Sequence, residues 1–194
     1  MKYNDIFISE GNTKIGKIPS VSLDVGVTCS HKWVCNKSCY AKHIAAFRPN
    51  VREQWLHNTR MLLKDPKAYE RSIMAFLAAR EPRYFRWHVG GEVINAKHAS
   101  LIKRIALYNP DTRFLLYTRR DDLPWKRRAP NLKIFFSFWQ LCGEREVPKK
   151  LKGEALAIIG DEPDKRAMQC PGGCEDCMFC FKSTSDKAVQ FKVH

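Results

Sequence analysis

The sequence RYFRWHVGGE, residues 83–92, predicts a short apolar strand that runs directly into two glycines and a glutamate. A helical pattern over residues 96–108 follows it. Further apolar stretches predict strands at residues 112–118, 131–139 and 154–160. Strands that alternate with helices are typical of right-handed crossovers and a parallel sheet. We therefore expect an α/β fold.

The sequence before this stretch extends the same pattern. Residues 21–28, VSLDVGVT, alternate apolar and polar side chains and predict a first strand that ends at Cys29. Helical patterns cover residues 39–64 and 67–80. Because about five strands are too few to close a barrel of eight, we expect a partial, open parallel β/α barrel of about five to six strands. This predicted domain spans residues 1–166, and residues 167–194 are expected to form an irregular, cysteine-rich C-terminal segment.

The composition is that of a globular protein. Of 194 residues, 44% are hydrophobic and 28% are charged, which excludes an intrinsically disordered chain. Every apolar run falls short of the roughly 20 residues that a membrane helix needs, and the first residues lack the apolar core of a signal peptide. We therefore expect a cytoplasmic protein with no membrane partner. In that reducing compartment, eight cysteines favour metal or redox chemistry over disulfides.

The net charge of +14 predicts attraction to polyanions, and nucleic acid is a candidate partner through a basic surface. Residues 117–128, YTRRDDLPWKRR, combine basic side chains with aromatic rings and could grip phosphates. A basic surface that serves only solubility explains the same charge. The sequence leaves both interpretations open.

Three cysteines lie in the loop after the first predicted strand, and we call them the N-terminal cysteine group: Cys29, Cys35 and Cys39. This loop lies at the carboxyl end of a strand, where parallel α/β folds place their function. Three thiolates suit an iron–sulfur cluster with one open iron, or a zinc ion completed from elsewhere. His31 and His43 are candidates for that completion, although single histidines are more often surface residues.

Four more cysteines crowd into the stretch CPGGCEDCMFC, and we call them the C-terminal cysteine group: Cys170, Cys174, Cys177 and Cys180. Their density predicts a metal site. The short gaps resemble iron–sulfur sequences more than paired zinc knuckles, so we favour a second iron–sulfur cluster over zinc. Cys142 stands alone and is expected to be a buried thiol outside both clusters.

The order of these motifs resembles the radical S-adenosylmethionine (SAM) superfamily, in which a cysteine loop follows the first strand and Gly-Gly-Glu follows the second. The resemblance implies that the N-terminal cysteine group holds a [4Fe–4S] cluster whose open iron is chelated by SAM. It also implies that Gly90, Gly91 and Glu92 contact the methionyl amine, since a carboxylate pairs with an ammonium group. The superfamily spacing is C-x3-C-x2-C, whereas this loop is C-x5-C-x3-C.

A closer resemblance is to the phage gene product 88 family. It is carried by GNTKIGKIPSVSL at residues 11–23, the Cys-Tyr-Ala block at 39–41, Tyr-Thr-Arg at 117–119 and the terminal cysteine run. The similarity covers most of the chain. The family is found in phages and mobile elements, so the resemblance implies a phage-type protein, located in the host cytoplasm if it is phage-encoded. The family supplies no substrate.

Three functions follow as hypotheses. The leading one is a radical SAM-like protein with two iron–sulfur clusters, both expected to be [4Fe–4S], that cleaves SAM to start radical chemistry on an unknown substrate. A flavodoxin or ferredoxin would supply its electrons. The second hypothesis keeps both clusters without SAM, as an electron-transfer or redox-sensing protein. The third is a zinc-stabilised nucleic-acid-binding module. Whether the chain is an enzyme stays open at this point.

Overall fold

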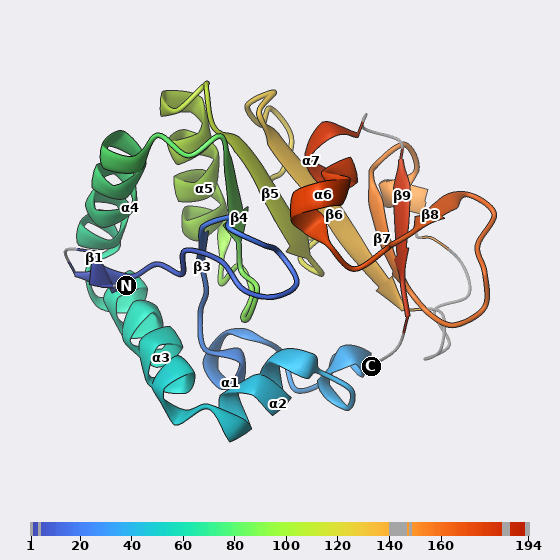
Figure 1. Cartoon of the computed structure of the whole chain (residues 1–194), viewed down its shortest axis with the longest axis horizontal. Helices are drawn as coiled ribbons and strands as arrows, with labels where there is room; N and C mark the ends of the chain where they lie inside the picture. The colour runs from blue at the N-terminus through green and yellow to red at the C-terminus, as the bar shows by residue number, and fades with distance from the viewer. Residues whose placement is uncertain (1, 4, 140–146, 148, 184–186, 193–194) are drawn as a thin grey trace.

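The computed structural model describes residues 2–3, 5–139, 147, 149–183 and 187–192. Within these residues, seven strands form one sheet in the order β3-β4-β5-β6-β7-β9-β8 (Figure 1). They are β3 (Ser20–Val21), β4 (Tyr84–Trp87), β5 (Arg113–Thr118), β6 (Leu132–Trp139), β7 (Leu156–Ile159), β8 (Ala167–Gln169) and β9 (Ala188–Phe191). Every neighbouring pair is parallel. The α/β class expected from the sequence is confirmed.

The helices come mostly between β3 and β5. They are α1 (Val25–Thr28), α2 (Tyr40–Phe47), α3 (Pro49–Lys64), α4 (Pro66–Arg80), α5 (Ala96–Tyr108), α6 (Cys174–Cys177) and α7 (Phe179–Lys182). A short antiparallel pair, β1 (Lys2–Tyr3) and β2 (Ile6–Phe7), lies beside α3 and α4 (Figure 1). In the described part of the chain, no helix is long and apolar enough to cross a membrane.

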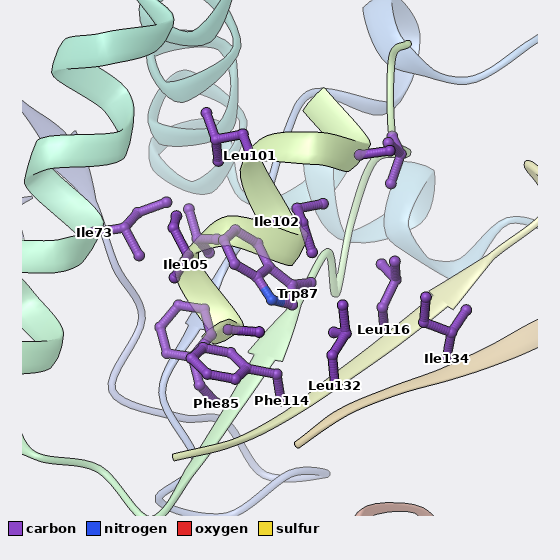
Figure 2. Packing of buried hydrophobic residues seen from close by; sticks show 14 of the residues in the cluster. Ile73, Phe85, Trp87, Leu101, Ile102, Ile105, Phe114, Leu116, Leu132 and Ile134 are labelled. Carbon is purple, nitrogen blue, oxygen red and sulfur yellow. The ribbon is translucent and has the colours of Figure 1, made fainter. Parts of the chain in front are cut away.

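One face of the sheet packs against α4 and α5 and holds the larger hydrophobic core. Side chains alternate between faces along a strand, so every second residue of β4 and β5 points toward these helices. The fully buried side chains of this core include Ile73, Phe85, Trp87, Ile102, Ile105, Phe114 and Leu116 (Figure 2). Burying each of them stabilises the fold by roughly 1.5–3 kcal/mol, so this core fixes the positions of β4 and β5.

Two segments that are far apart in the sequence cover the opposite side of the sheet, which we call the second face. Leu115 of β5 and Phe135 of β6 point to this side and pack against Ile15, Ile18 and Phe181. The N-terminal loop around residues 15–18 and the helices α6 and α7 therefore share one face. The cysteine-rich segment is part of the packed molecule.

The prediction of a strand over residues 21–28 is wrong beyond Val21. The Asp24 carboxylate accepts a hydrogen bond from the Val27 N–H at 3.0 Å and caps α1. The Leu23 N–H donates to the Gly90 carbonyl at 3.0 Å, outside the strand ladder. A side-chain cap that competes with the ladder explains why an alternating sequence becomes a helical turn here.

The helix predicted over residues 39–64 is two helices. Pro49 is the first residue of α3, and Arg48 before it has an extended φ of −130°. Proline disfavours the helical conformation in the preceding residue, which separates α2 from α3. The helix predicted over 67–80 begins one residue earlier, at Pro66, and the one over 96–108 is confirmed as α5.

The segment after residue 166, expected to be irregular, contains β8, α6, α7 and β9. β9 lies between β7 and β8, so the sheet has more strands than the five to six predicted. β8 and β9 have three and four residues and lie on either side of the cysteine-rich stretch. A periodic pattern is hard to recognise in so few residues. The division at residue 166 stays a prediction, while strands from both sides of it pair in one sheet.

Candidate functional site

The Gly-Gly-Glu segment follows β4 and passes very close to its neighbours. A Cβ on Gly90 would lie 2.5 Å from the Trp55 ring, and one on Gly91 would lie 2.6 Å from the Leu23 carbonyl oxygen. Gly91 also has a φ of +85°, which favours glycine. These glycines are thus required by the packing of the loop against the segment that leads into α1.

Glu92 is buried and holds the carboxyl ends of β4 and β5 together. Its Oε1 accepts hydrogen bonds from the Thr118 hydroxyl and the Val93 N–H, both at 2.7 Å. Its Oε2 accepts one from the Arg119 N–H at 2.8 Å. Burial raises the pKa of this carboxyl, and these donors act against the rise. A carboxylate offers about four acceptor positions, so these contacts leave one on Oε2.

The N-terminal cysteine group lies beside Glu92. Cys29 follows α1 directly, Cys35 is in a short 3₁₀ turn, and Cys39 precedes α2. Burial, together with the charges of Glu92, Cys39 and Cys35, raises the pKa of Cys29 to about 12. Burial also raises the pKa of Cys35, while the Arg119 cation acts against that rise. The structure therefore brings these thiols and the Gly-Gly-Glu segment to one place.

The C-terminal cysteine group lies on the second face. Cys174 begins α6, and its N–H donates to the Lys14 carbonyl at 3.0 Å, which ties the group to the N-terminal loop. Burial raises the pKa of Cys180 in α7 to about 11, and the Tyr117 hydroxyl acts against that rise. Cys170 and Cys174 interact electrostatically with Cys180. These thiols are half-buried.

The two cysteine groups are neighbours across the second face. Tyr40, directly after Cys39, donates its hydroxyl to the Val89 carbonyl at 2.5 Å. The Tyr40 hydroxyl interacts electrostatically with both Cys39 and Cys174. One side chain is therefore within reach of a thiol from each group, although the groups are far apart in the sequence.

The predicted metal ligands are all free thiols in this structure. Within the described ranges, no three side chains of His, Cys, Asp or Glu converge closely enough to hold a metal ion. His31 and His43, the alternative zinc ligands, are exposed. Cys142 lies outside the described residues. The donor set itself, three and four grouped thiols, fits iron–sulfur ligation by its chemistry, and the ligand assignments stay predictions.

The basic stretch at residues 117–128 uses several of its cations internally. Arg120 donates to the Val93 and Ile94 carbonyls at 3.0 and 2.7 Å and to the Asp122 carboxylate at 2.8 Å. Arg128 pairs with Glu154 at 2.6 Å. Arg120 therefore holds the residues that directly follow Glu92, and Arg128 is paired with Glu154 before β7. Phosphate binding by these arginines stays a prediction.

The site also contains residues to which the sequence analysis gave no individual role in the site: Thr28, Tyr40, Thr118 and Arg119. Thr118 and Arg119 stand at the carboxyl end of a confidently predicted strand, one strand along from Glu92. Neighbouring parallel strands end at one edge of the sheet, so this position could have identified them. The Thr28 hydroxyl accepts a hydrogen bond from the Glu92 N–H at 2.9 Å. No sequence pattern indicates this contact, which only the tertiary structure reveals.

Comparison with known proteins gives one match. A protein-family model described as Gene product 88 matches residues 8–183 of the chain, a range that includes every predicted site residue. Neither the curated proteins nor the solved structures contain a match.

Proposed function

The chain belongs to the Gene product 88 family, and we propose that it is a radical SAM-like iron–sulfur protein with two clusters. The N-terminal cysteine group would hold the reactive cluster, and the C-terminal cysteine group would hold the second. The sheet would serve as the partial β/α barrel on which both are mounted. The observation that carries the proposal is that the N-terminal thiols lie beside the Glu92 carboxyl group, while Tyr40 interacts with one thiol of each group.

Three thiols beside a buried carboxylate support the assignment of the reactive site. Cys29, Cys35 and Cys39 can supply three ligands, which leaves one iron of a [4Fe–4S] cluster for another ligand. When bound, the cluster and SAM would supply one-electron chemistry, with an external donor such as a flavodoxin or ferredoxin as the electron source. The chain's own contribution is to hold the thiols and to orient the ligand.

Glu92 supports a ligand role because its carboxyl group lies next to these thiols. Its three hydrogen-bond donors stabilise the carboxylate, and the remaining acceptor position on Oε2 is available for an ammonium group. Gly90 and Gly91 keep the backbone of this loop close to Leu23 and Trp55. Together these residues would orient the methionyl end of SAM.

An electron-transfer or redox-sensing protein without SAM is the second candidate, and two observations favour it. The loop spacing C-x5-C-x3-C is longer than that of the superfamily. The Glu92 carboxylate also has a purely structural use, since it joins the ends of β4 and β5. The zinc-stabilised nucleic-acid module is supported by the net charge of +14 alone.

Anaerobic purification followed by iron and sulfide analysis tests the proposal. Two [4Fe–4S] clusters would give about eight irons per chain. Serine substitution in either group should remove one cluster, and Cys142→Ser, the matched control, should remove none. Tightly bound zinc with negligible sulfide would contradict the proposal and favour the third candidate.

Adding SAM to the reduced protein separates the first two candidates. A radical SAM-like protein should change the electron paramagnetic resonance spectrum of its N-terminal cluster and release 5′-deoxyadenosine. An unchanged spectrum together with no 5′-deoxyadenosine would leave the redox protein.

A further inference from the structure

A cation lies on the second face, close to Tyr40 and to the C-terminal cysteine group. Arg86 is on β4, on the side opposite Phe85 and Trp87, and its guanidinium lies 4.6 Å from the centre of the Tyr117 ring. Its Nε is buried and has no hydrogen-bond partner among the described residues. Its charge acts on groups from both ends of the site: Tyr40, Tyr117, Cys174 and Cys180.

A second cation reaches the same place from the N-terminal loop. The Lys14 Nζ lies 5.9 Å from the centre of the Tyr40 ring and 5.6 Å from that of Phe191. Like Arg86, Lys14 acts electrostatically on Cys174. Both positive charges therefore act on Cys174, and each lies close to aromatic rings.

Carboxylates close to this region are engaged elsewhere. Glu92 interacts with the N-terminal thiols, Arg119 and Arg120. Glu175 packs against Gly16, and its Oε2 accepts from the Lys17 N–H at 3.2 Å. In the described part of the chain, Arg86 makes no ion pair. A partly desolvated guanidinium without an acceptor is costly, so an anion from outside the chain would stabilise it.

We propose that Arg86 and Lys14 form a binding site for an oxyanion, the carboxylate or phosphate group of the molecule on which this protein acts. The guanidinium fork fits two oxygens of either group, and the lysine adds a point charge. The aromatic rings of Tyr40 and Tyr117 flank the bound group. The role of the oxyanion as part of a substrate rests on the proposed function, whereas its binding does not require a cluster.

The position of Arg86 favours this assignment over that of a counter-ion for the C-terminal cluster alone. The guanidinium acts on Tyr40, which is next to Cys39, as well as on Cys174 and Cys180. A ligand held there would lie between the two cysteine groups. That location suits a molecule on which the N-terminal site acts.

Calorimetric titration of the anaerobically purified full chain with inorganic phosphate, and separately with acetate, tests the site at low ionic strength. We expect both anions to bind wild type. Arg86→Gln and Lys14→Gln should each weaken binding by about tenfold or more, because each removes a charge-assisted contact. Arg86→Lys should give an intermediate loss. Arg83→Gln is the matched control, since Arg83 is exposed and lies 5.5 Å from the Tyr84 ring.

Each outcome decides the proposal. Tighter phosphate binding points to a phosphorylated substrate and tighter acetate binding to a carboxylate, and both support the site. Equal affinity in wild type and Arg86→Gln would overturn it, as would a lack of binding to wild type. A shifted cluster potential in Arg86→Gln with unchanged anion affinity would reduce Arg86 to a counter-ion.

Iron and sulfide analysis of the same samples separates this proposal from the proposed function. Anion binding by a protein that contains no iron would support the oxyanion site and contradict the iron–sulfur function. A protein that contains iron but binds neither anion would support the iron–sulfur function and contradict the oxyanion site. If Arg86→Gln fails to fold, as judged by circular dichroism, Lys14→Gln and Arg86→Lys carry the test.

Discussion

At the residue scale, Glu92 has a structural task in the fold and a binding task under the proposed function, and a conservative substitution separates them. Glu92→Gln keeps the shape but turns one acceptor oxygen into a donor that faces the Thr118 hydroxyl or the Arg119 N–H. We expect a loss of about 1–3 kcal/mol in the free energy of unfolding, measured with urea. SAM binding to the cluster-loaded protein should weaken while iron content stays the same. Glu53→Gln, at an exposed position, is the control and should change stability by less than about 0.5 kcal/mol.

Gly91 makes a second prediction at this scale, and the chain offers a matched control. Gly91→Ala adds a Cβ 2.6 Å from the Leu23 carbonyl at a φ of +85°. Gly153→Ala meets a similar φ of +82° but no atom within 4 Å. Both variants bear the backbone strain, and only Gly91→Ala bears the clash as well. Gly91→Ala should therefore be less stable by more than about 1 kcal/mol, and equal losses would show that the loop relaxes freely.

At the scale of elements, α1 sets the start of the N-terminal cysteine group through one side chain. Asp24→Ala removes the carboxylate that accepts from the Val27 N–H and should cost about 0.5–2 kcal/mol. Cys29, directly after α1, should then react faster with an alkylating reagent in the cluster-free protein, because its burial loosens. Asp24→Asn keeps an acceptor and should restore both properties. Unchanged Cys29 reactivity in Asp24→Ala would show that α1 does not position this thiol.

The long elements could be predicted from the sequence, and the short ones could not. α5 and the strands β4 to β7 follow clear periodic patterns of apolar residues. β3, β8 and α1 have two to four residues, and contacts with distant parts of the chain determine them. The cysteines could be grouped from their spacing, whereas the approach of Tyr40 to both groups depends on the tertiary fold.

His88 shows why even a correct strand can mislead. The alternation along β4 predicts that Arg86 and His88 share a face, but His88 has a φ of +50° and lies after the strand ends. Its ring packs against that of His98 of α5, with centres 5.2 Å apart. The turn toward Gly90 brings the His88 side chain to the α5 side of the sheet. Strict alternation along a strand cannot predict such a turn.

At the scale of the whole molecule, this histidine pair predicts the pH dependence of stability. Burial lowers the pKa of His98 from 6.5 to about 3 and that of His88 well below 6.5. Below pH about 6.5 these two histidines bind protons in the unfolded chain but stay neutral in the folded protein, so the free energy of unfolding falls as pH falls. Each histidine contributes a slope of about 1.4 kcal/mol per pH unit in the free energy of unfolding, until its folded pKa is reached.

Urea unfolding between pH 6.5 and 4.5 checks this prediction. His98→Leu should remove the slope contributed by that histidine. A slope that is unaffected by His98→Leu would show that its ring is protonated in the folded protein.

The place of β9 has a consequence for the time course of folding. β8 precedes β9 in the chain, yet its neighbour in the sheet is β9. β8 must therefore wait, unpaired, until a later strand has docked on β7, and only then can it close the edge. Because α6 and α7 belong to the connection between these two strands, their cysteines reach the second face in the same late step. Pairings between distant segments form slowly. We therefore expect the docking of the C-terminal segment to be the slow step when a newly made chain folds.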